Sequence, residues 1–132
     1  MPFLEDMKAI LVAGGMTDGS IYLSGLPEHL STAVVALYEV SSGPAERAMG
    51  GVTVERRFSL QVICRGPKKD YAAARALAET VYGILGNRVT TVVNGSTYDQ
   101  VVATGSPSQL PLPDDNDAPL VVANYDVMKA GA

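Results

Sequence analysis

The stretch from Val52 to Gly66, VTVERRFSLQVICRG, holds the clearest period-two pattern in the chain. Apolar residues occupy most of its even positions and polar residues most of its odd positions, with Arg56 and Ile63 as the exceptions. Because successive side chains of a strand point to opposite faces of a sheet, this pattern predicts a strand with one buried and one wet face. We therefore expect an antiparallel sheet, with Cys64 on its apolar side.

A helix is predicted directly after this strand. Asp70 is a favourable N-cap residue, and Gly86-Asn87 closes the pattern. Between them one apolar stripe recurs at helical spacing: Tyr71, Ala74, Leu77, Ala78, Val81, Tyr82 and Leu85. About 16 residues would span roughly 24 Å, which is enough to cross several strands. We expect this helix to lie across one face of the sheet.

The segment before the sheet predicts a second, shorter helix over residues 3–13. Four apolar residues stand there at helical spacing, whereas Glu5, Asp6 and Lys8 are expected elsewhere on the helix. The apolar set is Phe3, Met7, Ile10 and Leu11. Gly14-Gly15 is expected to end this helix.

Three further segments predict strands. β-branched and aromatic residues fill 33–40 and 120–128, and two β-branched runs flank Asn94-Gly95, the pair best suited to a tight hairpin turn. The glycine-rich segment 41–51 is expected to be a mobile connection. Together the segments predict a single α+β domain over residues 1–132. Its antiparallel or mixed sheet of about four to five strands would carry the main helix on one face, with the short N-terminal helix beside it.

Charge is unevenly distributed along the chain. Residues 1–88 hold nine basic and nine acidic groups, whereas residues 89–132 hold five aspartates against Lys129, which accounts for the net charge of −4. Strong nucleic-acid binding needs a basic stripe that releases counterions, and this sequence lacks one. No apolar run approaches the roughly 20 residues of a membrane span, so we expect no membrane partner.

Catalytic chemistry finds little support in the sequence. His29 is the single histidine and stands in a proline-containing loop, where a surface role is commoner than a catalytic one. Cys64 lies on the predicted apolar face, and buried cysteines usually behave as small hydrophobic residues. No phosphate loop, nucleophile elbow or zinc-ligand spacing occurs. We expect no catalytic residues, no cofactor and no metal site, and therefore no enzyme.

Two charged clusters remain as candidate functional residues. The loop LPLPDDNDAPL carries Asp114, Asp115 and Asp117 between prolines, without the glycine and closing glutamate of a calcium loop. A solvated turn, a partner surface and, less favoured, a calcium site all stay open for it. The second cluster, Arg65, Lys68 and Lys69, follows the long strand, and Arg57 shares the wet face with Arg65. These cations could face an acidic patch of a neighbouring subunit or be unrelated surface residues.

The order and spacing of several segments resemble a known family. RFSLQVICRG, DYAAARALAETVYGILGN, VNGSTYDQVVATGSPSQLPLPDDND and the final NYDVM are similar to minor capsid or tail-terminator proteins of long-tailed bacteriophages. The likeness extends over nearly the whole chain and includes GLPEHLSTAVVALYEVSSGPA. No single segment is a strict signature; their order carries the resemblance.

The resemblance implies a small α+β structural protein of the virion without an active site. Such a protein forms a ring, commonly a hexamer of itself, at the head-proximal end of the tail. The ring ends polymerisation of the tail tube protein and offers the surface for the head or neck connector. It assembles in the host bacterial cytoplasm, and DNA passes through it without specific binding. Arg57, Arg65, Lys68, Lys69, Asp114, Asp115 and Asp117 would then face a neighbouring subunit or the channel.

Two other functions are compatible with the same residues. A head-completion or neck connector protein would also be small, oligomeric and described as a minor capsid protein. A small binding module would instead use the acidic loop for calcium or for a partner. Calorimetry that shows no calcium binding would exclude a calcium site in this loop.

Overall fold

The computed structural model describes residues 3–25, 32–40, 46–47, 53–67, 69–88, 90–109 and 118–130. The helical elements are α1 (Phe3–Ala13), the short 3₁₀ turn η1 (Asp18–Ser20) and α2 (Tyr71–Leu85). The strands are β1 (Ile21–Leu23), β2 (Val34–Val40), β3 (Glu46–Arg47), β4 (Thr53–Arg65), β5 (Asn87–Arg88), β6 (Thr91–Val93), β7 (Ser96–Ala103), β8 (Ser108–Gln109) and β9 (Leu120–Ala130). The α+β class is confirmed.

A single mixed sheet contains all the described strands, in the order β1-β2-β4-β9-β7-β5. β3 pairs with β4, β6 pairs with β7 and β8 pairs with β9. Only β1 and β2 run parallel, and all other pairs are antiparallel. The prediction of about four to five strands was too low, because β1, β3, β5, β6 and β8 contain only two or three residues each.

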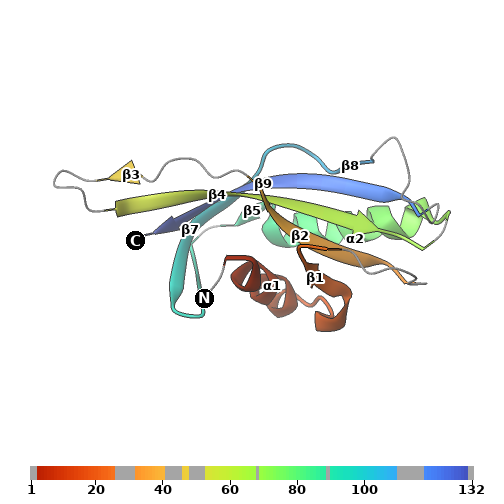
Figure 1. The fold of residues 1–132 in the computed structure, drawn as a ribbon, viewed down its shortest axis with the longest axis horizontal. Coiled ribbons are helices and arrows are strands. Elements are labelled where there is room, and N and C mark those ends of the chain that lie inside the picture. The colour runs from red at the N-terminus through yellow and green to blue at the C-terminus, as the bar shows by residue number, and fades with distance from the viewer. Residues whose placement is uncertain are drawn as a thin grey trace.

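The long pair β4–β9 forms the centre of the sheet and runs along the molecule (Figure 1). Its register joins Glu55 to Ala130 at one end and Arg65 to Leu120 at the other. β2 pairs along the other side of β4 from Ser59 to Arg65. The predicted alternation of β4 is confirmed over residues 58–64, where Phe58, Leu60, Val62 and Cys64 are buried.

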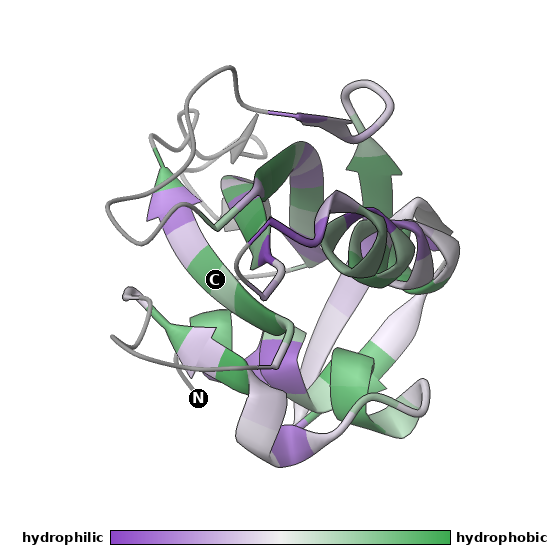
Figure 2. Ribbon diagram, turned by 90° about the vertical axis from the view of Figure 1, so that its right-hand side faces the viewer, coloured by the Kyte–Doolittle hydropathy of each residue, from purple (hydrophilic) through white to green (hydrophobic). Residues whose placement is uncertain are grey.

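Both helices pack on the same face of the sheet. The buried residues of α1 and α2 join one hydrophobic core with residues of β2, β4, β7 and β9. In Figure 2 hydrophobic and hydrophilic residues follow one another along the same helices and strands, as expected where each element buries one side. Neither described helix is long and apolar enough to cross a membrane.

Helix α2 begins and ends where its sequence predicts. The Asp70 side chain accepts a hydrogen bond of 3.1 Å from the backbone N–H of Ala73, as an N-cap residue does. Four members of the predicted apolar stripe are buried: Ala74, Ala78, Val81 and Leu85. Tyr71 and Tyr82, which the stripe also includes, are instead exposed at its edges. Tyrosine tolerates this position because its hydroxyl end can remain in water.

The Asn94-Gly95 hairpin is confirmed as the turn between β6 and β7. Asn94 has a φ of 50° and Gly95 a φ of 82°, the left-handed conformations that a two-residue hairpin turn requires. The glycine-rich segment 41–51 lies outside the described residues except for Glu46-Arg47, which form β3. His29 also lies outside them.

Candidate assembly surfaces

The second face of the sheet has no described helix packed on it. Register partners on neighbouring strands share a face, so Arg57 lies opposite Met128, Ser59 opposite Asp126 and Gln61 opposite Asn124. We define the helix-free face by these residues together with the next pair along: Arg57, Ser59, Gln61, Ile63, Val122, Asn124, Asp126 and Met128. Its middle is polar and its Ile63–Val122 end is apolar, and all eight side chains are half-buried or exposed.

The helix-free face carries charges of both signs at one end. Arg57 and Asp126 are both exposed and stand on adjacent strands, one diagonal step apart. Diagonal neighbours in an antiparallel pair lie about 7–8 Å apart, within reach of a long side chain. Arg57, from the first two-thirds of the sequence, and Asp126, from the acidic last third, therefore lie on the same face of one subunit.

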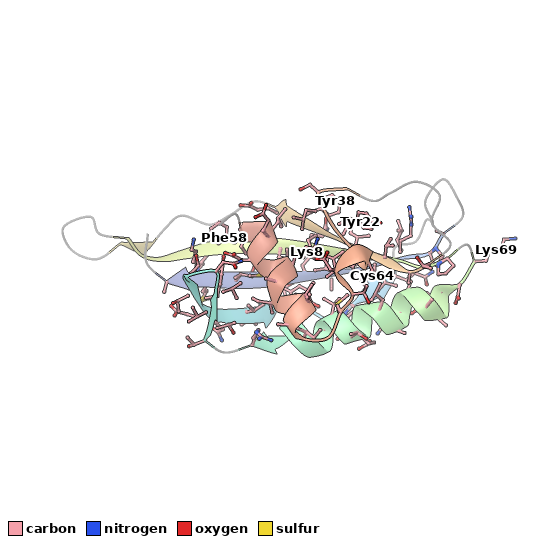
Figure 3. The ribbon with its side chains drawn as sticks, turned by 90° about the horizontal axis from the view of Figure 1, so that it is seen from below. Lys8, Tyr22, Tyr38, Phe58, Cys64 and Lys69 are labelled. Carbon is pink, nitrogen blue, oxygen red and sulfur yellow. The ribbon has the colours of Figure 1, made fainter. Side chains whose placement is uncertain are left out.

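Among the described residues of the predicted cationic set, Arg57 lies apart from Arg65 and Lys69. Arg57 and Arg65 share a face of β4, as predicted, but eight residues separate them, or roughly 26 Å along a strand. Lys69 is exposed beyond the carboxyl end of β4, just before α2. In Figure 3 Lys69 lies at the far end of the molecule from Phe58, the neighbour of Arg57. Lys68, Asp114, Asp115 and Asp117 lie outside the described residues.

Arg65 differs from the other two cations because it is 5% exposed. Its register partners are Val34, which is buried, and Leu120. Ala118 and Pro119, just before β9, are also buried, and the Pro119 carbonyl accepts a hydrogen bond of 3.1 Å from the backbone N–H of Gly66. The chain that returns from the acidic loop thus packs beside the end of β4. The sequence pattern placed Arg65 on a wet face and did not predict this burial.

A buried carboxylate on α1 was also not predicted. Asp6 is fully buried, although it was expected elsewhere on the helix than the apolar residues. Its Oδ1 accepts a hydrogen bond of 3.0 Å from Asn94 Nδ2, and its Oδ2 accepts one from the Tyr98 hydroxyl. Asp6 follows Phe3 by three positions and precedes Ile10 by four, so helical spacing alone could have placed it on the buried stripe.

The Asp6 carboxylate connects α1 to the β6–β7 hairpin, two elements that lie far apart in the sequence. Burial, the hydrogen bond to Asp6 and the charge of Asp6 raise the pKa of the Tyr98 hydroxyl above its ordinary value of 10.0. The hydroxyl therefore stays protonated and donates at every physiological pH. The cluster can hold two elements together, but Tyr98 offers no proton for chemistry near neutral pH.

Cys64 has the properties of a structural cysteine. It lies in the core, and burial raises the pKa of its thiol from 9.0 to about 12. A thiol with that pKa is protonated near neutral pH, whereas the thiolate is the nucleophile. Within the described ranges no three residues among histidine, cysteine, aspartate and glutamate are grouped closely enough to hold a metal ion.

An open groove of about 510 Å³ runs along the outer side of α1. Its lining combines the apolar residues Ala9, Val12 and Ala13 with charged residues at its rim. Across it Lys8 Nζ lies 3.2 Å from Asp18 Oδ1. The groove is shallow and its charges already face each other, so it is a surface feature of the helix rather than a convergent ligand site.

Comparison with known proteins agrees with the fold. No curated protein matches the sequence. Among solved structures, one that is 13% identical aligns with a TM-score of 0.59 and covers 97% of this chain and 96% of that chain, a likeness that concerns the fold alone. A family model described as bacteriophage tail terminator protein matches residues 10–129. The chain therefore belongs to the family of bacteriophage tail terminator proteins, structural components of the virion.

Proposed function

We propose that this chain forms a ring of identical subunits, a hexamer, at the head-proximal end of a phage tail. There it ends the polymerisation of the tail tube and provides the surface that joins tail to head. The single observation that carries this proposal is the family match over residues 10–129. The role is structural rather than enzymatic, which agrees with the protonated state of Cys64 near neutral pH.

The proposed partners are further copies of the chain, the tail tube protein below the ring and the head or neck connector above it. Assembly takes place in the host bacterial cytoplasm before the tail joins the head. DNA crosses the ring without specific binding. The net charge of −4 supports this last point, because each phosphate that a protein neutralises adds binding free energy and would slow passage.

A capping assay tests this function directly. Purified tail tube protein is polymerised with and without this chain, and the products are measured by negative-stain electron microscopy. We expect shorter tubes that carry ring-shaped density at one end. Unchanged tube length without terminal density would contradict a terminator role. Binding to the isolated head connector alone would instead favour the head-completion alternative.

The charged residues singled out in the sequence are proposed to lie in the contact between neighbouring subunits or along the channel. The exposure of Arg57 and Lys69 supports this for those two cations. For Arg65, which is buried within its own subunit, a contact with a neighbour would require the end of β4 to open. Lys68, Asp114, Asp115 and Asp117 complete the proposed set.

Charge reversal tests the acidic part of this set. Changing Asp114 and Asp115 together to lysine is expected to lower the fraction of protein in rings or the infectious yield, because attraction to a cationic neighbour becomes repulsion. Light scattering measures the first and plaque counts the second. Reversal of the exposed Glu5 and Glu39 makes the same change in net charge and serves as the matched control. If the two double variants behave alike, the loop is merely solvated.

A further inference from the structure

The strand order of the single sheet leaves one edge at each of its two ends. β1 is one edge, and β5 with β6, which both pair with the outer side of β7, make up the other. Among the described residues no strand pairs with the outer side of β1 or of β6. A strand edge of this kind presents backbone N–H and C=O groups that can pair with another chain.

β1 and β6 are short strands, and neither carries a charged residue or a proline as further protection against such pairing. Monomeric proteins commonly place lysine, proline or a bulge on their edge strands. β1 reads Ile-Tyr-Leu and β6 reads Thr-Val-Val, so neither strand has a charge or a proline. Val92, the central residue of β6, is 69% exposed, the highest value among the exposed large hydrophobic residues of the described chain.

The β6 edge is held in place by side-chain hydrogen bonds at both of its ends. At the turn, Asn94 Nδ2 donates to the buried carboxylate of Asp6 at 3.0 Å. At the other end, Arg88 Nε donates to Thr91 Oγ1 at 3.0 Å. A three-residue strand has little stability of its own, and these bonds fix its position before any partner arrives. An edge that is already ordered loses less conformational entropy on binding.

The directions of the two edge strands match. The path through the sheet from β1 to β6 crosses β2, β4, β9 and β7. One of its five strand pairs is parallel and four are antiparallel, so β1 and β6 point in the same direction. Copies related by rotation about a ring axis keep their strand directions relative to that axis. The β6 edge of one copy would therefore meet the β1 edge of the next as a parallel pair, a heterologous contact that can close a ring.

Charge and side-chain orientation agree with this parallel pairing. Arg88 stands three residues before β6, and Asp18, whose side chain is 74% exposed, stands three residues before β1. Parallel pairing of Thr91–Val93 with Ile21–Leu23 brings Arg88 to the same end of the contact as Asp18, which also pairs with Lys8 of its own subunit. Tyr22 pairs with Ala36, which pairs with Ile63, so Tyr22 lies on the same face of the sheet as Ile63. Val92 pairs with Thr97, whose side chain points away from the face on which its neighbour Tyr98 is buried. Both central residues thus lie on the helix-free side.

From these observations we infer that successive subunits join by parallel pairing of the β6 edge of one copy with the β1 edge of the next, with Val92 beside Tyr22. The occupant of each edge is a second copy of this chain. This inference rests on the proposed ring and names the surfaces that form it. The hydrogen bonds of Asp6 and Arg88 act as positioning contacts that present the β6 edge.

Cysteine cross-linking tests the pairing. The native chain has one cysteine, Cys64, which is buried and therefore reacts slowly with thiol reagents. In the full-length Tyr22→Cys, Val92→Cys double variant, a short bis-maleimide linker is expected to give a ladder of covalent species up to the full ring on a denaturing gel. Each single variant should remain almost entirely at the position of one chain, because a single thiol has no partner across the contact.

The matched control moves the first cysteine from β1 to the start of α2. Tyr71 is the first residue of α2 and is 41% exposed, so Tyr71→Cys with Val92→Cys offers two accessible thiols without the proposed proximity. The control pair should give no ladder. Negative-stain images of each variant before linking establish that rings are present. Loss of rings in Val92→Cys alone, with an unchanged melting curve, would also place Val92 in the contact.

The possible outcomes separate the inference from the proposed function. If the Tyr22→Cys, Val92→Cys variant forms rings but gives no ladder, or if both cysteine pairs give equal ladders, the edge pairing is overturned and the ring still stands. If the unaltered chain forms no ring, alone or at tail-tube ends, the proposed function fails and the pairing fails with it.

Discussion

At the scale of single residues, Asp6 is a buried polar group that joins α1 to the β6–β7 hairpin. It is fully buried and bonded by Asn94 and Tyr98. Asp6→Ala would leave the buried Tyr98 hydroxyl without its acceptor, so we expect the free energy of unfolding to fall by about 3 kcal/mol. Urea denaturation followed by circular dichroism measures this. The neighbouring exposed residue gives the control: Glu5→Ala should change it by less than about 0.5 kcal/mol.

Alkaline pH should unfold the protein because three groups prefer their protonated forms in the core. Burial raises the pKa of Cys64 from 9.0 to about 12 and raises the pKa values of Tyr98 and Tyr125 above 10.0. The unfolded chain ionises first, so stability is fully present below pH 9 and declines above it. Each group contributes about 1.4 kcal/mol per pH unit within its own window.

Urea denaturation at stepwise pH values between 8 and 11 measures this decline. We expect a shallow slope above pH 9, where only the thiol titrates in the unfolded chain, and a steeper one above pH 10. In Cys64→Ala the first onset should disappear and the decline should begin near pH 10. A stability that stays constant up to pH 11 would show that these side chains are not buried as described.

At the scale of elements, the contact between the end of β4 and the start of α2 depends on Gly66. A Cβ atom at this position would collide with the backbone carbonyl oxygen of Asp70 and approach Ala74 N to 3.0 Å. Gly66→Ala is therefore expected to destabilise the protein by about 2 kcal/mol. Gly83, an exposed residue of α2 with open space around it, is the matched control, because Gly83→Ala should stabilise by about 1 kcal/mol. Opposite signs in thermal or urea unfolding would confirm the packing; equal effects would contradict it.

The long elements could be predicted from the sequence because their patterns repeat. α1, α2, β4 and the Asn94-Gly95 hairpin all appear where periodicity, capping and turn residues place them. β1, β3, β5 and β8 span only two or three residues, too few for a period of two to be visible. They form because a neighbouring strand supplies the hydrogen bonds, which is information from the tertiary fold and not from the local sequence.

For the candidate surfaces too, local patterns could be predicted from the sequence and contacts between distant segments could not. The shared face of Arg57 and Arg65 could be predicted from strand alternation. The burial of Arg65 could not, because strand alternation does not show which distant segments pack beside the end of β4, where Pro119 accepts a hydrogen bond from Gly66. Asp6 shows the opposite case: its position on the apolar stripe was visible, but a carboxylate is rarely assigned to a core. Its hydrogen-bond donors, Asn94 and Tyr98, become neighbours only in the folded chain.

At the scale of the whole molecule, the distribution of charge fits an assembling subunit better than a nucleic-acid-binding one. The net charge is −4, and the acidic last third of the chain includes β9, which runs beside β4 and brings Asp126 near Arg57. Among the described residues no strand pairs with the outer sides of β1 and β6, two uncharged strands that run in one direction. A subunit with these properties can bind its own copies head to tail, as the proposed ring requires.

The mass of the purified protein tests the ring most directly. Size-exclusion chromatography with light scattering, combined with negative-stain images, should show a species of six times the 13.8 kDa chain mass with six-fold symmetry and a central hole. The same ring should appear at the ends of tail tubes. A mass of 13.8 kDa at every concentration, with no ring at tail-tube ends, would contradict the account.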